Sequence, residues 1–168
     1  MIRPEDIKAL RKIRSITTRA ERFAELAHAG QVRRGTEQPY VEHCRRVARA
    51  AEVEIRRYLK GSSATKKEAD RHVDDCVAAA FMHDVIEDAN VTIGTVLEAG
   101  FNKAVVNLIN CLTRTPNQKY DDFIADIATA WPDVKIIKIC DIVDNLADEP
   151  SNAQVEKYRR ALITLCNP

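Results

Sequence analysis

The sequence predicts an all-α fold, a compact bundle of about eight or nine helices in one domain that spans residues 1–168. Apolar residues recur at helical spacing along nearly the whole chain, and no stretch alternates convincingly in the manner of a strand. Only 5 glycines and 6 prolines interrupt this pattern. A chain of 168 residues can also bury roughly 70% of its unfolded surface without disulfides. Together these observations favour a globular helical protein over a disordered chain.

Nine segments carry a helical pattern, and most have a residue suited to begin or end them. They cover approximately residues 4–15, 19–29, 40–59, 68–88, 93–99, 103–114, 120–130, 132–148 and 152–165. Pro4 suits the first turn of the first helix. Thr17 or Thr18 is expected to cap the second helix, which Gly30 ends. The stretch "KGSSATKK" separates the third from the fourth and predicts a surface loop, because the core pattern resumes directly after it.

Polar caps and a proline also mark the helices of the second half. Thr92 and Asn102 are expected to cap the fifth and sixth helices, and Gly100 ends the fifth. The segment "TPNQ" predicts a turn before the seventh helix, and Pro132 opens the eighth. The segment that bears the chemical motifs described below extends over about residues 20–147.

Charge and cysteine content exclude several functional classes. The formal net charge is +1 with acids and bases interspersed, so nothing indicates a face for duplex nucleic acid. Five cysteines without a CxxC spacing predict buried free thiols and a cytoplasmic location. The charged N-terminus predicts no signal peptide, and no apolar run approaches the length of about 18 residues that a membrane span needs. The oligomeric state stays open.

The segment "FMHDVIEDAN", residues 81–90, combines core-forming residues with four ionisable side chains. On a continuous helix, at about 100° per residue, His83, Asp84, Glu87 and Asp88 would share one sector. Carboxylates this close repel one another, so they need raised pKa values or a cation. An exposed acidic stripe is the alternative, but the apolar "CVAAAF" that precedes the segment favours a buried helix.

A metal site needs further ligands, and two more ionisable side chains lie in strongly apolar helices. His43 sits in "YVEHCRRVARAAE" and Asp141 in "VKIIKICDIVDNLAD", where a buried acid should have a partner. With His83 and Asp84 they make a set that suits manganese, iron or zinc better than magnesium. Asn145 lies one turn after Asp141 on the same helix face.

The order of these residues resembles that of the HD phosphohydrolase superfamily, an all-helical and metal-dependent family. Three segments are similar to motifs of its RelA/SpoT hydrolase branch: "AHAGQVRRGTEQPYVEH", "HDVIEDANVT" and "KICDIVDNL". The segment "LTRTPNQKYDDFIADIA" resembles the part between the last two motifs. The chain is too short to carry an alarmone synthetase domain as well, so the resemblance implies a small stand-alone hydrolase with an HD-domain bundle.

The resemblance also implies roles for individual residues. It implies one Mn²⁺ ion with four ligands: His43, His83, Asp84 and Asp141. It implies two acids that position and deprotonate the attacking water: Glu87 and Asp88. It implies three residues near the nucleotide substrate: Arg33, Arg34 and Asn145. The family reaction removes pyrophosphate from the 3′ position of (p)ppGpp and leaves GDP or GTP.

Several positions depart from the family pattern: Cys44, Ala89, Ile142, Asp144, Ala147 and Asp148. None is an expected metal ligand, so these departures bear on the substrate more than on hydrolysis. They leave open an HD phosphohydrolase for another nucleotide or phosphate ester. A nucleotide-binding regulator without turnover is a further alternative, although it would not need the acid pair. A dinuclear iron oxygenase needs more ligands, and His28 and His72 are expected to be structural and solvated respectively.

Overall fold

The computed structural model describes residues 2–167, which form ten α-helices and no strand. In chain order these are α1 (Pro4–Leu10), α2 (Ile16–Ala27), α3 (Val41–Tyr58), α4 (Lys66–Phe81), α5 (Val85–Asp88), α6 (Ile93–Glu98), α7 (Lys103–Leu112), α8 (Tyr120–Thr129), α9 (Pro132–Ala147) and α10 (Asn152–Cys166). The predicted all-α bundle is confirmed. None of the helices within these residues is both long and apolar enough to cross a bilayer.

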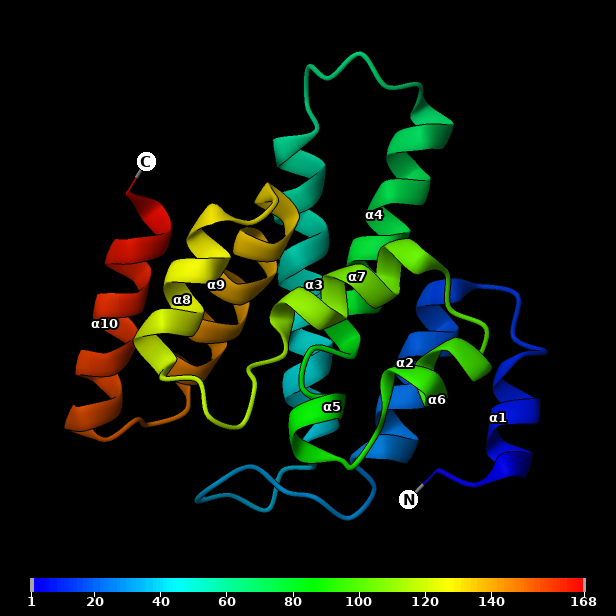
Figure 1. Ribbon diagram of the computed structural model, residues 1–168, viewed down its shortest axis with the longest axis horizontal. Coiled ribbons are helices and arrows are strands. Elements are labelled where there is room, and N and C mark those ends of the chain that lie inside the picture. Colours follow the sequence, from blue (N-terminus) through cyan, green and yellow to red (C-terminus); the bar gives the residue numbers. More distant parts are fainter. Residues whose placement is uncertain (1, 168) are drawn as a thin grey trace.

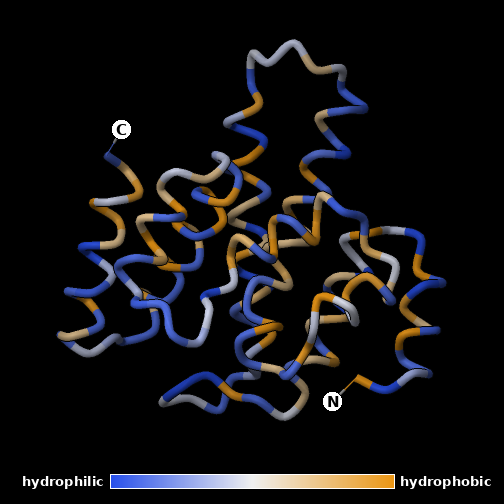
Figure 2. The backbone as a smooth tube through the Cα atoms, viewed as in Figure 1, coloured by the Kyte–Doolittle hydropathy of each residue, from blue (hydrophilic) through white to orange (hydrophobic). Residues whose placement is uncertain are grey.

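Helices α3 and α4 pack against each other at the centre of the bundle (Figure 1). Helices α2 and α7 pack on α4, while α9 packs on α3 and carries α8 and α10 on its outer side. Hydrophobic residues recur along the central helices between hydrophilic ones, whereas the loop between α3 and α4 is mostly of intermediate hydropathy (Figure 2). The core therefore holds side chains from many elements, among them Phe23, Val47, Cys76, Ile109 and Ile137.

The helix predicted over residues 68–88 is two helices, because the chain turns at residues 82–84. The buried imidazole of His83 lies with its Nδ1 2.8 Å from the carbonyl oxygen of Ala80. In a continuous helix that carbonyl would accept from the amide of Asp84. The His83 side chain thus binds a carbonyl that a backbone amide would bind in a continuous helix. The rotation of about 100° per residue, which predicted four ionisable groups in one sector, therefore does not apply across this turn.

Helix ends otherwise follow the predicted chemistry, with two corrections. The first helix ends at Leu10 and not near residue 15. Ser15 caps α2 by accepting from the Thr18 amide at 3.2 Å, so the helix begins before the threonines expected to cap it. Thr92 and Asn102 cap α6 and α7 as predicted. In the loop that follows α2, the Nδ1 atom of buried His28 lies 2.7 Å from Gln31 Oε1, which confirms the structural role expected of this histidine.

Candidate metal centre

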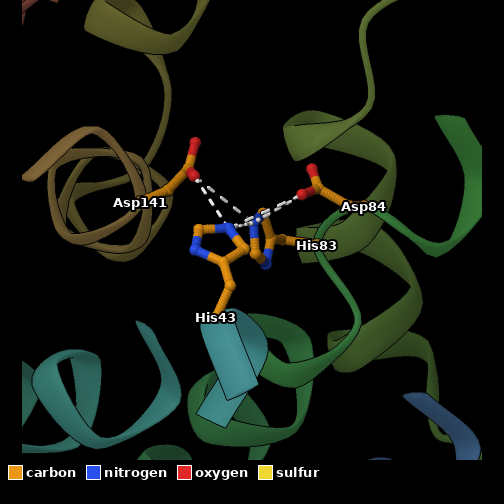
Figure 3. A group of neighbouring side chains, drawn as sticks. All are labelled: His43, His83, Asp84 and Asp141. Atoms are coloured by element: carbon orange, nitrogen blue, oxygen red, sulfur yellow. Dashed lines mark hydrogen bonds and ion pairs between the residues drawn. The ribbon is translucent and has the colours of Figure 1, made fainter. Parts of the chain in front are cut away.

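Four side chains from three parts of the fold converge on one point in the core (Figure 3). His43 lies in the first turn of α3, and Asp141 lies in α9. His83 and Asp84 occupy the turn between α4 and α5. One ligand atom from each of the four lies within 4.8 Å of the others. The residues predicted as a metal-binding set are therefore neighbours in space.

The distances between these atoms fit a single divalent ion. His43 Nε2 lies 3.3 Å from both His83 Nε2 and Asp141 Oδ1. His83 Nε2 lies 3.0 Å from Asp84 Oδ2 and 3.5 Å from Asp141 Oδ1. Ligands about 2.1 Å from one ion lie roughly 3.0–3.5 Å from each other in octahedral or tetrahedral geometry. Two imidazoles and two carboxylates at this spacing suit Mn²⁺, Fe²⁺ or Zn²⁺.

Hydrogen bonds on the far side of each imidazole turn its Nε2 atom toward the centre. Because the Ala80 carbonyl can only accept, Nδ1 of His83 carries the proton of the bond between them. Nδ1 of His43 lies 2.7 Å from Asp144 Oδ2 and donates to that carboxylate. Each Nε2 therefore keeps its lone pair for an ion whenever the ring is neutral.

Before an ion binds, the imidazoles and carboxylates pair with one another. Burial would lower the pKa of His43, but hydrogen bonds to three carboxylates outweigh burial and raise this pKa to about 9. Burial opposes charge on Asp141 as well, yet Lys138 and the two histidines hold the pKa of its carboxyl well below the usual range. Lys138 Nζ donates to Asp141 Oδ2 at 2.8 Å, so this buried acid has a partner, as expected.

We expect the affinity for a divalent metal to rise with pH up to the His43 pKa of about 9 and to level off above it, because metal binding requires neutral imidazoles. The contribution of the His43 ion pairs to folding stability changes with pH in the opposite direction. The folded pKa of His43 is raised, so its pairing stabilises the protein fully below about pH 6.5 and loses this effect as the pH rises to about 9.

Calorimetric Mn²⁺ titrations at several pH values, in buffers of different ionisation enthalpy, measure the affinity and count the released protons. Each released proton should change the affinity up to about tenfold per pH unit. An affinity that does not change with pH would contradict the assignment of His43 as a ligand.

The acid pair predicted to act on water lies beside this centre, on the single turn α5. Burial raises the pKa of Glu87 and of Asp88, and the charge on Asp84 raises both further. The amide of Arg114 opposes this at Glu87 by donating to Oε1 at 2.8 Å. The Tyr40 hydroxyl donates to Asp84 Oδ2 at 2.6 Å and lies 3.3 Å from Asp88 Oδ2. Tyr40 thus joins the metal set to the acid pair, a role that no local sequence pattern indicated.

Two cavities adjoin at the centre. The smaller, of about 250 Å³, is lined by the acids of the centre and by three cations: Arg114, Lys138 and Lys157. The larger, of about 730 Å³, opens between the 32–36 loop and the start of α10. Tyr40, Asn145 and Tyr158 line both cavities. A ligand with a compact anionic end and a larger organic part would fit this arrangement.

Two of the three residues predicted near the substrate are linked to the metal set. Asn145 Nδ2 donates to Asp141 Oδ1 at 2.6 Å, and Asn145 Oδ1 accepts from Arg33 Nη2 at 2.8 Å. Arg33 also pairs with Asp148 at 2.7 Å. Arg34 is exposed and lines the larger cavity. Contact of these residues with a substrate stays a prediction.

Comparison with known proteins agrees with this geometry. A family model described as "HD domain" matches residues 20–168. The chain belongs to the HD-domain family. A solved structure described as "A metazoan ortholog of SpoT hydrolyzes ppGpp and plays a role in starvation responses" shares the fold, with a TM-score of 0.69 and 22% sequence identity. The match covers 91% of this chain and 84% of that one. No curated protein matches the sequence.

One departure of this HD domain from the RelA/SpoT motif touches the metal centre itself. Asp144 stands where that motif has histidine, and this departure was expected to bear on the substrate and not on the metal. It lies instead behind His43, and Arg46 donates to both of its oxygens at 2.7 and 3.0 Å. Burial opposes its charge, but His43 and Arg46 lower the pKa of Asp144 to about 2. The added acid is therefore neutralised within the protein and orients an imidazole of the candidate metal set.

Replacing Asp144 by Asn is expected to weaken metal binding about 10- to 100-fold, because an amide orients the His43 ring less firmly and makes it less basic. The matched control is Arg46→Gln, which removes the other partner of Asp144 but leaves the carboxylate at His43. We expect the control to change the affinity less than about threefold. Calorimetry on the two variants measures both values, and equal losses would contradict the proposed action through His43.

Proposed function

We propose that this HD domain is a metal-dependent phosphohydrolase that removes pyrophosphate from the 3′ position of (p)ppGpp. The observation that carries the proposal is a four-residue metal-binding geometry with Glu87 and Asp88 on the wall of the same cavity. A regulator that only binds a nucleotide needs no such acid pair. The SpoT ortholog with the same fold hydrolyses ppGpp, which supports the substrate class. A cytoplasmic location fits this substrate.

The chain's own residues would move the protons of the reaction. A bound divalent ion would polarise a phosphoryl oxygen and lower the pKa of a water. Glu87 accepts the water proton on Oε2, because the Arg114 amide already occupies Oε1. The water oxygen bonds to phosphorus, the bond from phosphorus to the ribose 3′ oxygen breaks, and that oxygen takes up a proton. A general base of this kind is worth about 100- to 10,000-fold.

Cations and space are arranged to suit a nucleotide with a terminal pyrophosphate. Arg114 and Lys157 line the smaller cavity together with the acids, where they can bind phosphate oxygens. The larger cavity of about 730 Å³ lies within the range of about 300–1,000 Å³ that is usual for small-molecule sites. The guanosine would therefore lie toward the 32–36 loop, with the 3′ pyrophosphate at the metal.

A second candidate, hydrolysis of another nucleotide or phosphate ester, is favoured by the pairing of two arginines. Arg33 is bound to Asp148, and Arg46 is bound to Asp144. Arginines that already bind carboxylates in the protein are less available for a second, 5′ diphosphate. This observation favours a substrate with fewer phosphates than ppGpp.

The test is product analysis by phosphorus NMR with manganese-loaded protein, ppGpp, and Asp84→Ala as the blank. We expect GDP and pyrophosphate from the wild type alone. No turnover, with manganese shown to be bound, would contradict the alarmone substrate. Release of orthophosphate from another nucleotide in a panel would then support the second candidate, and tight binding without any turnover would support a regulator.

A further inference from the structure

A second cluster of potential metal ligands lies at the start of α9, and none of its residues lines the cavity at the centre. His72 and Cys76 are one turn apart on α4, and Asp133 lies in the first turn of α9. His72 Nε2 lies 3.1 Å from Asp133 Oδ2 and 3.7 Å from Cys76 Sγ. One ligand atom from each of the three lies within 4.8 Å of the others. His72 is exposed as expected, and its Nε2 atom nevertheless has two partners.

Two features of the cluster are not explained by an ordinary ion pair between His72 and Asp133. Oδ1 of Asp133 is buried and finds no hydrogen-bond partner anywhere in residues 2–167, whereas buried carboxylate oxygens are normally satisfied. The fully buried thiol of Cys76 lies against the same imidazole nitrogen that contacts the carboxylate. A salt bridge explains the contact between His72 and Asp133, but it explains neither the thiol nor the unpaired oxygen.

The spacing of the three donor atoms fits a thiophilic ion. Zinc binds sulfur at about 2.3 Å and nitrogen or carboxylate oxygen at about 2.0–2.2 Å, so tetrahedral ligands lie roughly 3.3–3.6 Å apart. The separations from His72 Nε2 to the carboxylate oxygen and to the thiol sulfur, 3.1 and 3.7 Å, bracket that range. The side chain of His72 is 44% exposed, which leaves an open side for the ion to enter and for a water to bind.

We propose that His72, Cys76 and Asp133 form a second metal site, which binds Zn²⁺ with a water as the fourth ligand. Nitrogen and thiolate donors together select zinc over magnesium or calcium. The Cys76 proton passes to solvent when the Zn–S bond forms. The ion would link α4, the helix that precedes His83, to α9, the helix that carries Asp141. This site does not depend on the reaction proposed above.

Cobalt is the probe that tests the proposal, because a thiolate ligand gives Co²⁺ a near-ultraviolet charge-transfer absorption. The titrations use the Asp84→Asn protein, in which the first centre is disabled and contains no cysteine ligand. We expect one equivalent of Co²⁺ with thiolate absorption, and displacement of the cobalt by Zn²⁺. Zinc at about 100 times its dissociation constant should raise Tm by about 5 °C or more.

Three further substitutions in that background locate the site. Cys76→Ser should abolish the thiolate absorption, whereas Cys44→Ser, which alters the cysteine next to His43, should keep it. His72→Gln should lower the affinity at least about tenfold, and its partly exposed position makes it suitable if Cys76→Ser fails to fold. Absence of thiolate absorption, its survival in Cys76→Ser, or an unchanged affinity in His72→Gln would each overturn the proposal.

Discussion

The Asp84→Asn protein is expected to lose the metal at the first centre and at least about 1,000-fold in kcat/KM, which corresponds to about 4 kcal/mol. A bound metal supplies several kcal/mol of transition-state stabilisation, and this substitution removes the charge of one of its four ligands. The amide has nearly the shape of the carboxylate, so the surrounding packing stays the same. The loss should therefore come from metal binding and not from unfolding.

Metal content, steady-state rates and urea unfolding on the same preparations separate these effects. The matched control is Asp122→Asn, which changes an exposed acid in the first turn of α8. We expect the control to keep one equivalent of manganese and the wild-type rate. If the Asp84→Asn protein kept both as well, the centre formed by the two histidines and two carboxylates would not be the catalytic one.

Contacts within one helix could be predicted from the sequence because helical spacing determines them. Lys138, Asp141 and Asn145 lie on one face of α9, and the hydrogen bonds of Asp141 to the other two are those that this spacing indicates. The metal set itself followed from the order of the motifs. The contacts within α9 depend on residues that are close in the sequence, and the metal set was indicated by the order of residue types along the chain.

Contacts that join distant segments could not be predicted in the same way. His43 and Asp144 are 101 positions apart, and Arg33 and Asp148 are 115 apart, so no periodicity relates them. The break before α5 was missed for a different reason: its hydrogen bond is local, from His83 to the Ala80 carbonyl, but helical periodicity does not indicate that an imidazole takes a backbone carbonyl. The sequence predicted Glu87 near the centre from the rotation of one continuous helix. In the structure Glu87 lies there because of the turn at residues 82–84 and the separate helix α5.

Glu87→Gln is expected to lower kcat about 100- to 10,000-fold and to leave the manganese affinity unchanged. Glu87 is outside the set of four ligands, and its carboxylate is the group proposed to accept the water proton. Glutamine keeps the amide contact from Arg114, because its side-chain carbonyl can accept as Oε1 does. Calorimetry and steady-state rates at saturating ppGpp measure the two quantities, and a parallel loss of metal would contradict the role of base.

The pH profile decides whether Glu87 works as a base or only holds the site in shape. Burial and the charge on Asp84 raise the pKa of Glu87, so the active carboxylate is lost as the pH falls through that raised value. At manganese concentrations that keep the centre saturated at every pH, wild-type kcat should therefore decline on the acid side, and this decline should disappear from the residual activity of Glu87→Gln. Asp88→Asn, which alters the neighbouring acid, should keep the decline. The same acid-side decline in both variants would mean that another group takes the proton.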